Sequence, residues 1–286
     1  MKITVLGIGF DATLVIQLLK KSIPAHYVAI SANSSDLKQY EGEKIRYIGR
    51  PSVDAAASRI LSKVKAHTLD SDIVFLFSEI TGKSQENIVC NIAEGIEDKT
   101  VISIVWYSKQ KHGQQGLSDT LDRLGACSAV VAIPISKQNT LLSLAPEYAE
   151  QILRMYKLPY AHAEPGTGKR VIENGGLLHL AQEEVDIAYL DHAGATLPWG
   201  LSCINYSCKL DTLLEYSQSA LLHLTIPPAT PPKKLQYVCE YIFSLMGDES
   251  ELNFHLSVDH ELKNSMMIEL LATCSITAKE AESWIY

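Results

Sequence analysis

The feature that most constrains the fold of this 286-residue chain is a regular alternation of short apolar segments with segments of helical apolar spacing. The apolar segments predict strands, at residues 2–6, 26–31, 72–77, 100–106 and 129–134. The segments between them predict helices, at residues 11–21, 52–67, 84–96 and 116–124. Because the strands are apolar on both faces, they fit a parallel sheet that helices cover on each side. We therefore expect a doubly wound α/β domain over residues 1–172, with ligands at the carboxyl ends of its strands.

The second half of the chain has a different pattern. Helices are predicted at residues 145–157, about 181–191 and 233–246, and strands at residues 219–226, 252–258 and 265–276. The order strand, helix, strand, strand is typical of a smaller α+β domain. We expect this second domain over residues 173–286.

The composition excludes several classes of partner. With 33 acidic and 25 basic residues the net charge is −8, so the chain lacks the positive field that binds nucleic acid. It has no apolar run near the roughly 20 residues of a membrane span, and its opening strand leaves no room for a signal peptide. The six cysteines form no CxxC pair and mostly lie in apolar segments, as free thiols do in a reducing compartment. These observations predict a cytoplasmic protein that neither binds nucleic acid nor inserts directly into a membrane.

The first strand is followed by the turn GIGFDA, residues 7–12. This matches GxGxxA, with Gly7 and Gly9 as the glycines that let backbone N–H groups approach a pyrophosphate. A dinucleotide site also needs an acid at the end of the second strand to hold the ribose. That strand ends at Ser31, and the nearest acid is Asp36. An NAD(P)-dependent oxidoreductase whose second domain binds substrate therefore stays open as an alternative.

A second glycine motif, Gly82-Lys83-Ser84, follows the strand at 72–77 and precedes a helix. A P-loop requires GxxxxGK[ST], but Phe77 stands where its first glycine would be. The nine histidines show neither HExxH nor paired ligand spacing, and no GxSxG elbow is present. The sequence therefore predicts no metal site and no catalytic residue.

Taken in order, these segments resemble the FtsZ/tubulin superfamily. ITVLGIGF resembles the family's opening strand and glycine loop, YVAISANSSDL the segment AINTDAQAL, and VVAIPISKQNTLLSLAP the segment IVIPNDRLLEIAP. The stretch from GGLLHLAQEEVDIAYLDHAGATLPWG to LLATCSI parallels the rest of that family's chain. The similarity is loose but runs from residue 2 to about residue 276. It implies a Rossmann-like GTPase-type domain with a parallel sheet and a smaller α+β C-terminal domain.

The family's phosphate-binding loops are altered in this chain. FtsZ carries GGGTGTG where this chain has residues 81–87, TGKSQEN, and its first loop has several more glycines than Gly7 and Gly9. Side chains in such loops obstruct the close approach of the backbone to phosphate. The resemblance therefore implies a vestigial nucleotide site, at Gly7, Gly9, Asp11, Ser31, Gly82, Lys83 and Ser84. Binding of GTP or GDP stays open, and no other cofactor is expected.

The loop that one FtsZ subunit inserts into its neighbour reads GxxNxDxxD. The corresponding residues here are 176–184, with interface positions at Gly176, His179, Ala181, Glu183 and Glu184. The family's aspartates activate the attacking water, which the methyl group of Ala181 cannot do. The resemblance thus implies that GTP hydrolysis is lost. We expect a cytoskeletal, FtsZ-like protein that self-assembles as a scaffold, or that joins or regulates an FtsZ-type filament in a process such as cell division.

Overall fold

The computed structural model describes residues 1–47, 54–80, 83–96, 99–107, 124–134, 138–156, 177–191 and 214–274. The chain divides into two compact units, Met1–Gln151 and Ile152–Tyr286. The predicted domain boundary at residues 172–173 falls outside the described residues and stays a prediction. Among the described helices, none is long and apolar enough to cross a membrane.

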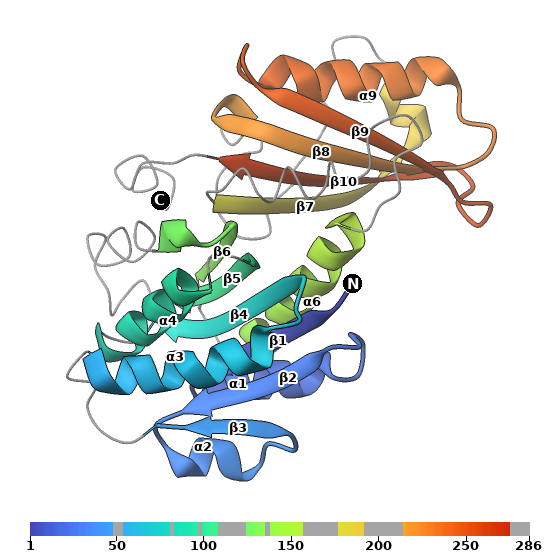
Figure 1. Ribbon diagram of the computed structural model, residues 1–286. Helices are drawn as coiled ribbons and strands as arrows, with labels where there is room; N and C mark the ends of the chain where they lie inside the picture. Colours follow the sequence, from blue (N-terminus) through green and yellow to red (C-terminus); the bar gives the residue numbers. More distant parts are fainter. Residues whose placement is uncertain are drawn as a thin grey trace. The chain divides into compact units, whose positions relative to one another are not determined.

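The first unit is built on a parallel sheet with the strand order β3-β2-β1-β4-β5-β6 (Figure 1). Its strands are β1 Ile3–Ile8, β2 His26–Ser31, β3 Glu43–Arg46, β4 Ile73–Ile80, β5 Thr100–Tyr107 and β6 Ala129–Pro134. Every residue of β1 and of β5 is buried, because both faces of these strands are covered. The predicted parallel α/β sheet is confirmed.

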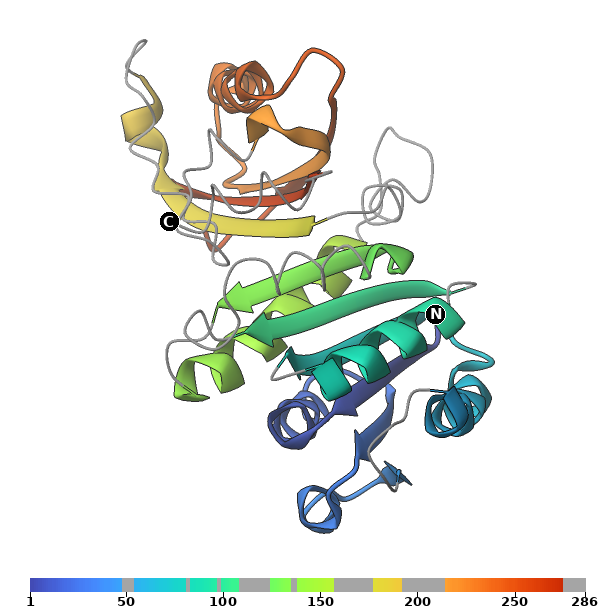
Figure 2. The same ribbon diagram turned by 90° about the vertical axis from the view of Figure 1, so that its left-hand side faces the viewer.

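Helices cover both faces of this sheet. They are α1 Phe10–Leu19, α2 Ser34–Lys38, α3 Asp54–Thr68, α4 Lys83–Gly95, α6 Gln138–Tyr156 and the 3₁₀ turn η1 Leu124–Ala126. Figures 1 and 2 place α3 and α4 together on one face and α1 and α6 on the other. In α3, Ile60 and Val64 lie four residues apart and are both buried, which turns one helical stripe toward the sheet.

The turn between β1 and α1 depends on its two glycines. A Cβ atom on Gly7 would lie only 2.9 Å from the Ala12 carbonyl oxygen and 2.9 Å from the Ile16 side chain. Gly9 has φ 92°, a backbone conformation that residues with a Cβ atom rarely adopt. Gly7 therefore allows α1 to pack closely on β1, and Gly9 allows the chain to turn into the helix.

The second unit is a mixed sheet with the strand order β7-β10-β8-β9, also visible in Figure 1. Its elements are β7 Leu177–Asp186, the 3₁₀ turn η2 Ile187–Asp191, β8 Ser217–Ile226, α9 Pro232–Leu245, β9 Glu251–Val258 and β10 Ser265–Cys274. Strand β10 is antiparallel to β7 and β8, while β8 and β9 are parallel and joined through α9. Val238 and Ile242 of α9 pack into a core with side chains from one face of the sheet.

The helix predicted at about residues 181–191 is wrong. Residues up to Asp186 form β7, and only the short 3₁₀ turn η2 follows. Strand β7 pairs with β10 over ten successive positions, from Leu177 to Asp186. Partner strands and a shared core outweigh local helix propensity in such a segment. The helix predicted at 116–124 lies almost entirely outside the described residues.

Candidate functional site

The candidate site lies where β1 and β4 end and where α1 and α4 begin, which we call the carboxyl edge. Strand β1 ends at Ile8 and α1 begins at Phe10, while β4 ends at Ile80 and α4 begins at Lys83. The two strands are parallel neighbours with Ile8 opposite Ser78. Both helix N-termini therefore belong to one edge of the sheet, the place where α/β folds bind ligands and where free N–H groups attract anions.

Gly9, the residue before α1, has both of its backbone groups engaged. The N–H group of Gly9 donates to the Ile30 carbonyl oxygen at 2.9 Å. The Gly9 carbonyl oxygen accepts from the Thr13 N–H at 3.1 Å and from the Thr13 hydroxyl at 2.7 Å. Gly9 thus uses its backbone groups to join β2 to the first turn of α1.

The first two residues of α1 are unsuited to a phosphate group. Phe10, the first residue of α1, is 49% exposed and presents an apolar side chain to solvent at the start of the helix. Asp11 adds a carboxylate to the first turn, where the helix dipole favours it. The same carboxylate repels a phosphate. The carboxyl edge therefore presents bulk and negative charge at α1.

Ser31, at the end of β2, serves the neighbouring short helix. Its buried hydroxyl donates to the Asp36 carboxylate at 2.6 Å and accepts from the Asn33 N–H at 3.1 Å. Asn33 caps α2 by accepting from the Ser35 N–H at 3.0 Å. These contacts hold the turn after β2, and a nucleotide role for Ser31 stays a prediction.

The remaining predicted nucleotide residues can be placed only in part. Gly7 lies inside β1, and Lys83 and Ser84 are the first two residues of α4. The side chains of Lys83 and Ser84, and all of Gly82, lie outside what the structure describes. The nucleotide-binding role of these residues is therefore still a prediction.

Two tyrosines add neutral groups to the ends of other strands. Burial raises the pKa of Tyr107, the last residue of β5, to about 12. Burial also raises the pKa of Tyr47, which follows β3, and the Asp36 charge acts in the same direction. Neither phenol can serve as a base near neutral pH.

The residues predicted to contact a neighbouring subunit lie in β7 wherever they are described. Ala181 is buried opposite Leu270, while Glu184 is exposed opposite Met267 and accepts a hydrogen bond from the Ser265 hydroxyl. His179 and Glu183 are described by their backbone alone, and Gly176 lies outside the described residues. The segment is a strand where a loop is expected, and its role in an interface stays a prediction.

A buried polar network in the second unit escaped the sequence patterns. His223 Nδ1 lies 2.9 Å from Glu269 Oε2, and His223 Nε2 lies 2.9 Å from Ser257 Oγ. The other Glu269 oxygen accepts from Arg154. This order resembles a Ser–His–carboxylate triad, but the guanidinium of Arg154 neutralises the carboxylate. We interpret the network as a satisfied polar cluster that joins β8, β9 and β10 to Arg154, which belongs to the second unit although most of α6 lies in the first.

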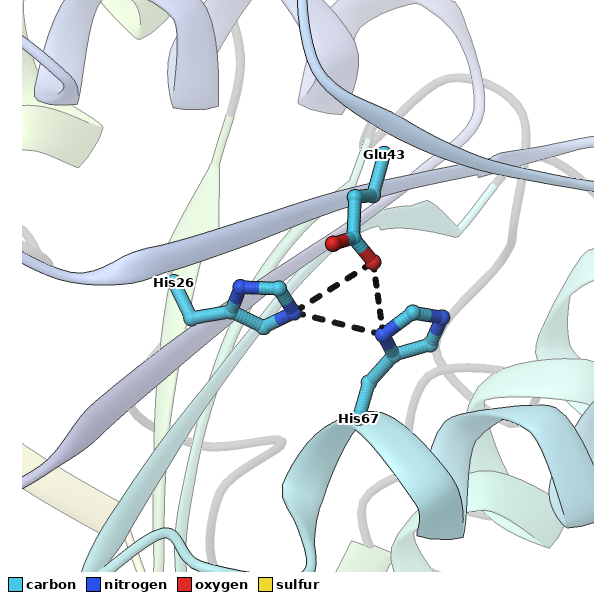
Figure 3. A group of neighbouring side chains, drawn as sticks. All are labelled: His26, Glu43 and His67. Atoms are coloured by element: carbon cyan, nitrogen blue, oxygen red, sulfur yellow. Dashed lines mark hydrogen bonds and ion pairs between the residues drawn. The ribbon is translucent and has the colours of Figure 1, made fainter.

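The opposite edge of the first sheet carries a second cluster that sequence analysis missed (Figure 3). His26 begins β2, Glu43 begins β3, and His67 lies in the last turn of α3. We call these three residues the amino-edge cluster. The sequence could have indicated this cluster only through the positions of its residues, at the starts of two adjacent strands and at the end of a helix. Such ends meet at one edge of a parallel sheet.

Comparisons with known proteins identify the fold. No protein-family model matches the sequence, and no curated protein matches it significantly. Among solved structures, a variant of FtsZ from M. jannaschii matches with TM-score 0.68 and 19% identity, covering 95% of this chain and 90% of its own. A GTPγS-bound protofilament of CetZ2 from Haloferax volcanii matches with TM-score 0.70 and 12% identity, covering 100% of this chain and 96% of the CetZ2 chain. TubZ from Bacillus thuringiensis serovar israelensis, in GDP-form protofilaments, matches with TM-score 0.68 and 8% identity, covering 99% of this chain and 90% of the TubZ chain. The described parallel sheet and the second mixed sheet agree with these matches, and the chain therefore has the fold of the FtsZ/tubulin superfamily.

Proposed function

We propose that this chain is an FtsZ-like cytoskeletal protein that self-assembles, with a degenerate GTP site that does not hydrolyse GTP. It acts in the cytoplasm as a scaffold, or as a partner of an FtsZ-type filament. Support comes from similar structures that are themselves assemblies, an FtsZ dimer and the CetZ2 and TubZ protofilaments. A head-to-tail contact between copies of one chain produces open filaments of this kind.

The observation that carries the proposal is the N-terminus of α1. Phe10 and Asp11 occupy its first turn, and Gly9 directs its N–H group to the Ile30 carbonyl oxygen. A phosphate needs close access to free N–H groups and a favourable local charge. The exposed ring and the carboxylate oppose both requirements, which supports a site that binds GTP weakly or not at all.

The oxidoreductase alternative receives no comparable support. The three similar structures are an FtsZ, a CetZ2 and a TubZ, and none of these three is named as an oxidoreductase. Asp36, the acid nearest the end of β2, lies in α2 and not at the strand end, where a dinucleotide site needs its acid. NAD(P) chemistry therefore has no support in this chain.

The proposal is tested by sedimentation and electron microscopy of the purified chain, with and without GTP, alone and mixed with a genuine FtsZ. We expect filaments or co-pelleting with FtsZ, no dependence of self-assembly on GTP, and no release of phosphate. Turnover of GTP at the rate of an ordinary FtsZ would contradict the degenerate site. A chain that stays monomeric and never pellets with FtsZ would contradict the assembly role.

A paired variant isolates the cause of weak GTP binding. Phe10→Gly combined with Asp11→Asn removes the ring and the charge from the first turn of α1, so GTP affinity should rise relative to the unmodified chain. The control is Phe243→Gly, which removes a 60% exposed phenylalanine from α9 in the second unit. Equal GTP affinity in all three proteins would show that these two residues do not block the site.

A further inference from the structure

The amino-edge cluster brings three potential metal ligands together from three elements. His26 Nε2 lies 3.2 Å from His67 Nδ1 and 3.6 Å from Glu43 Oε2. His67 Nδ1 lies 2.8 Å from the same Glu43 oxygen. Figure 3 shows all three atoms pointing toward a common centre. Among the described residues, this is the one group of three such side chains within ligand distance of one another.

The spacing of these atoms fits a tetrahedral metal. With metal–ligand bonds of 2.0–2.1 Å, neighbouring ligands in a zinc tetrahedron lie about 3.3 Å apart. The three distances here, 3.2, 3.6 and 2.8 Å, lie on both sides of that value. Lengthening the shortest distance by about 0.5 Å and shortening the longest by about 0.3 Å would bring all three atoms to the spacing of a zinc tetrahedron.

The cluster is held in place by regular structure. His26 and Glu43 belong to adjacent strands of the sheet, and His67 belongs to α3, whose Thr68 hydroxyl donates to the Val64 carbonyl oxygen at 3.1 Å. The two imidazole rings stack with 5.4 Å between their centroids and 26° between their planes. Ligands on strands and helices keep their geometry better than ligands on loops.

The donor set selects a class of metal. Two imidazoles and one carboxylate suit Zn²⁺ and similar transition metals, while Mg²⁺ and Ca²⁺ prefer oxygen ligands. Three protein ligands leave a fourth position for water or for an external ligand. His26 and His67 also line an open pocket of about 570 Å³, which offers a route for that fourth ligand.

We propose that His26, Glu43 and His67 form a binding site for a zinc-class divalent ion at the amino edge of the first sheet. The ion joins the start of β2, the start of the edge strand β3 and the last turn of α3. This site lies on the opposite edge of the sheet from the candidate nucleotide site, and the inference does not depend on GTP binding or on assembly.

The test uses the full chain stripped of metal with a chelator. Zn²⁺ binding is measured by competition with a chromophoric chelator, and Co²⁺ binding by its visible spectrum. We expect tight binding of one Zn²⁺ ion that His67→Ala, His26→Ala and Glu43→Gln each weaken at least about tenfold. The matched control His260→Ala removes an exposed histidine of the second unit and should leave the affinity unchanged.

The spectrum distinguishes this site from a site built on cysteine. Co²⁺ should give the visible bands of tetrahedral coordination without the near-ultraviolet charge transfer that thiolate ligands produce. Folding of each variant is checked by circular dichroism. If a histidine variant fails to fold, the test rests on Glu43→Gln, which preserves the size of the side chain. Zn²⁺ affinity that is equal in the unmodified chain, Glu43→Gln and His67→Ala would overturn the proposal, as would thiolate bands in the Co²⁺ spectrum.

Discussion

Glu269 is the most completely buried charged residue among those described, and its side chain is 1% exposed. It lies in the middle of β10, directly opposite His223 on β8, and its two oxygens contact His223 and Arg154. A buried carboxylate is tolerated only when such partners compensate the loss of water. The network therefore stabilises the second unit only while all of its members are present.

Glu269→Gln should lower the free energy of unfolding by about 2–4 kcal/mol, because it keeps the shape but leaves Arg154 and His223 without their charged acceptor. Urea denaturation measures this change. The control Gln236→Ala removes an exposed hydrogen bond to Glu240 within α9 and should change stability by no more than about 0.5 kcal/mol. A loss below about 0.5 kcal/mol for Glu269→Gln would mean that the network contributes nothing to stability.

At the scale of the element, the turn from β1 to α1 shows what its glycines are for. Gly7 is required by the closeness of α1, whose Ala12 carbonyl oxygen and Ile16 side chain leave no space for a Cβ atom. Packing of helix on strand thus accounts for this glycine without any ligand. A GxGxxA spacing in a sequence can therefore come from helix packing, without a nucleotide site.

Gly7→Ala should destabilise the chain by about 1–3 kcal/mol, because the new methyl group meets a backbone oxygen that cannot move independently of α1. Thermal or urea unfolding measures the loss. The matched control is Gly125→Ala in η1, where a Cβ atom would meet nothing within 4 Å. Equal stability of the two variants would contradict the packing role of Gly7.

Most elements could be predicted because their apolar patterns are continuous and local. Strands β2 and β6 agree at both ends with the predicted 26–31 and 129–134, and α9 differs from the predicted 233–246 by one residue at each end. Strand β7 could not be predicted, because its conformation depends on pairing with β10, about 80 residues later. The amino-edge cluster was missed for a similar reason: its ligands come from three separate elements, so no short motif contains them.

At the scale of the whole molecule, alkaline pH should weaken the fold. Burial raises the pKa of several tyrosines in the first unit, which are Tyr27, Tyr40, Tyr47 and Tyr107. For Tyr27 the pKa rises from 10.0 to about 12, through burial and then through the Glu150 charge. The Tyr27 hydroxyl also donates to the Ile23 carbonyl oxygen at 2.7 Å, which only the protonated form can do.

Above pH 10 the unfolded chain releases phenolic protons that the folded chain keeps, so the free energy of unfolding falls with rising pH. The stabilisation is complete below pH 10 and is lost as pH rises toward about 12. Urea denaturation at pH 8, 10 and 11.5 should therefore give decreasing stability. Tyr27→Phe should cost about 1 kcal/mol at neutral pH and make the alkaline loss shallower. An unchanged slope in that variant would exclude Tyr27 as a contributor.

The pairing of β7 with β10 also limits how the gene can change. Ala181 and Val185 face the core under α9, while the other face carries the exposed Gln182 and Glu184 beside the buried Leu178 and Leu180. Removing a single residue before Ala181 would exchange these faces and carry an amide and a carboxylate into the core, because side chains along a strand alternate. Deletions and insertions of a single codon within residues 177–186 should therefore be selected against, because they break this alternation of faces along β7.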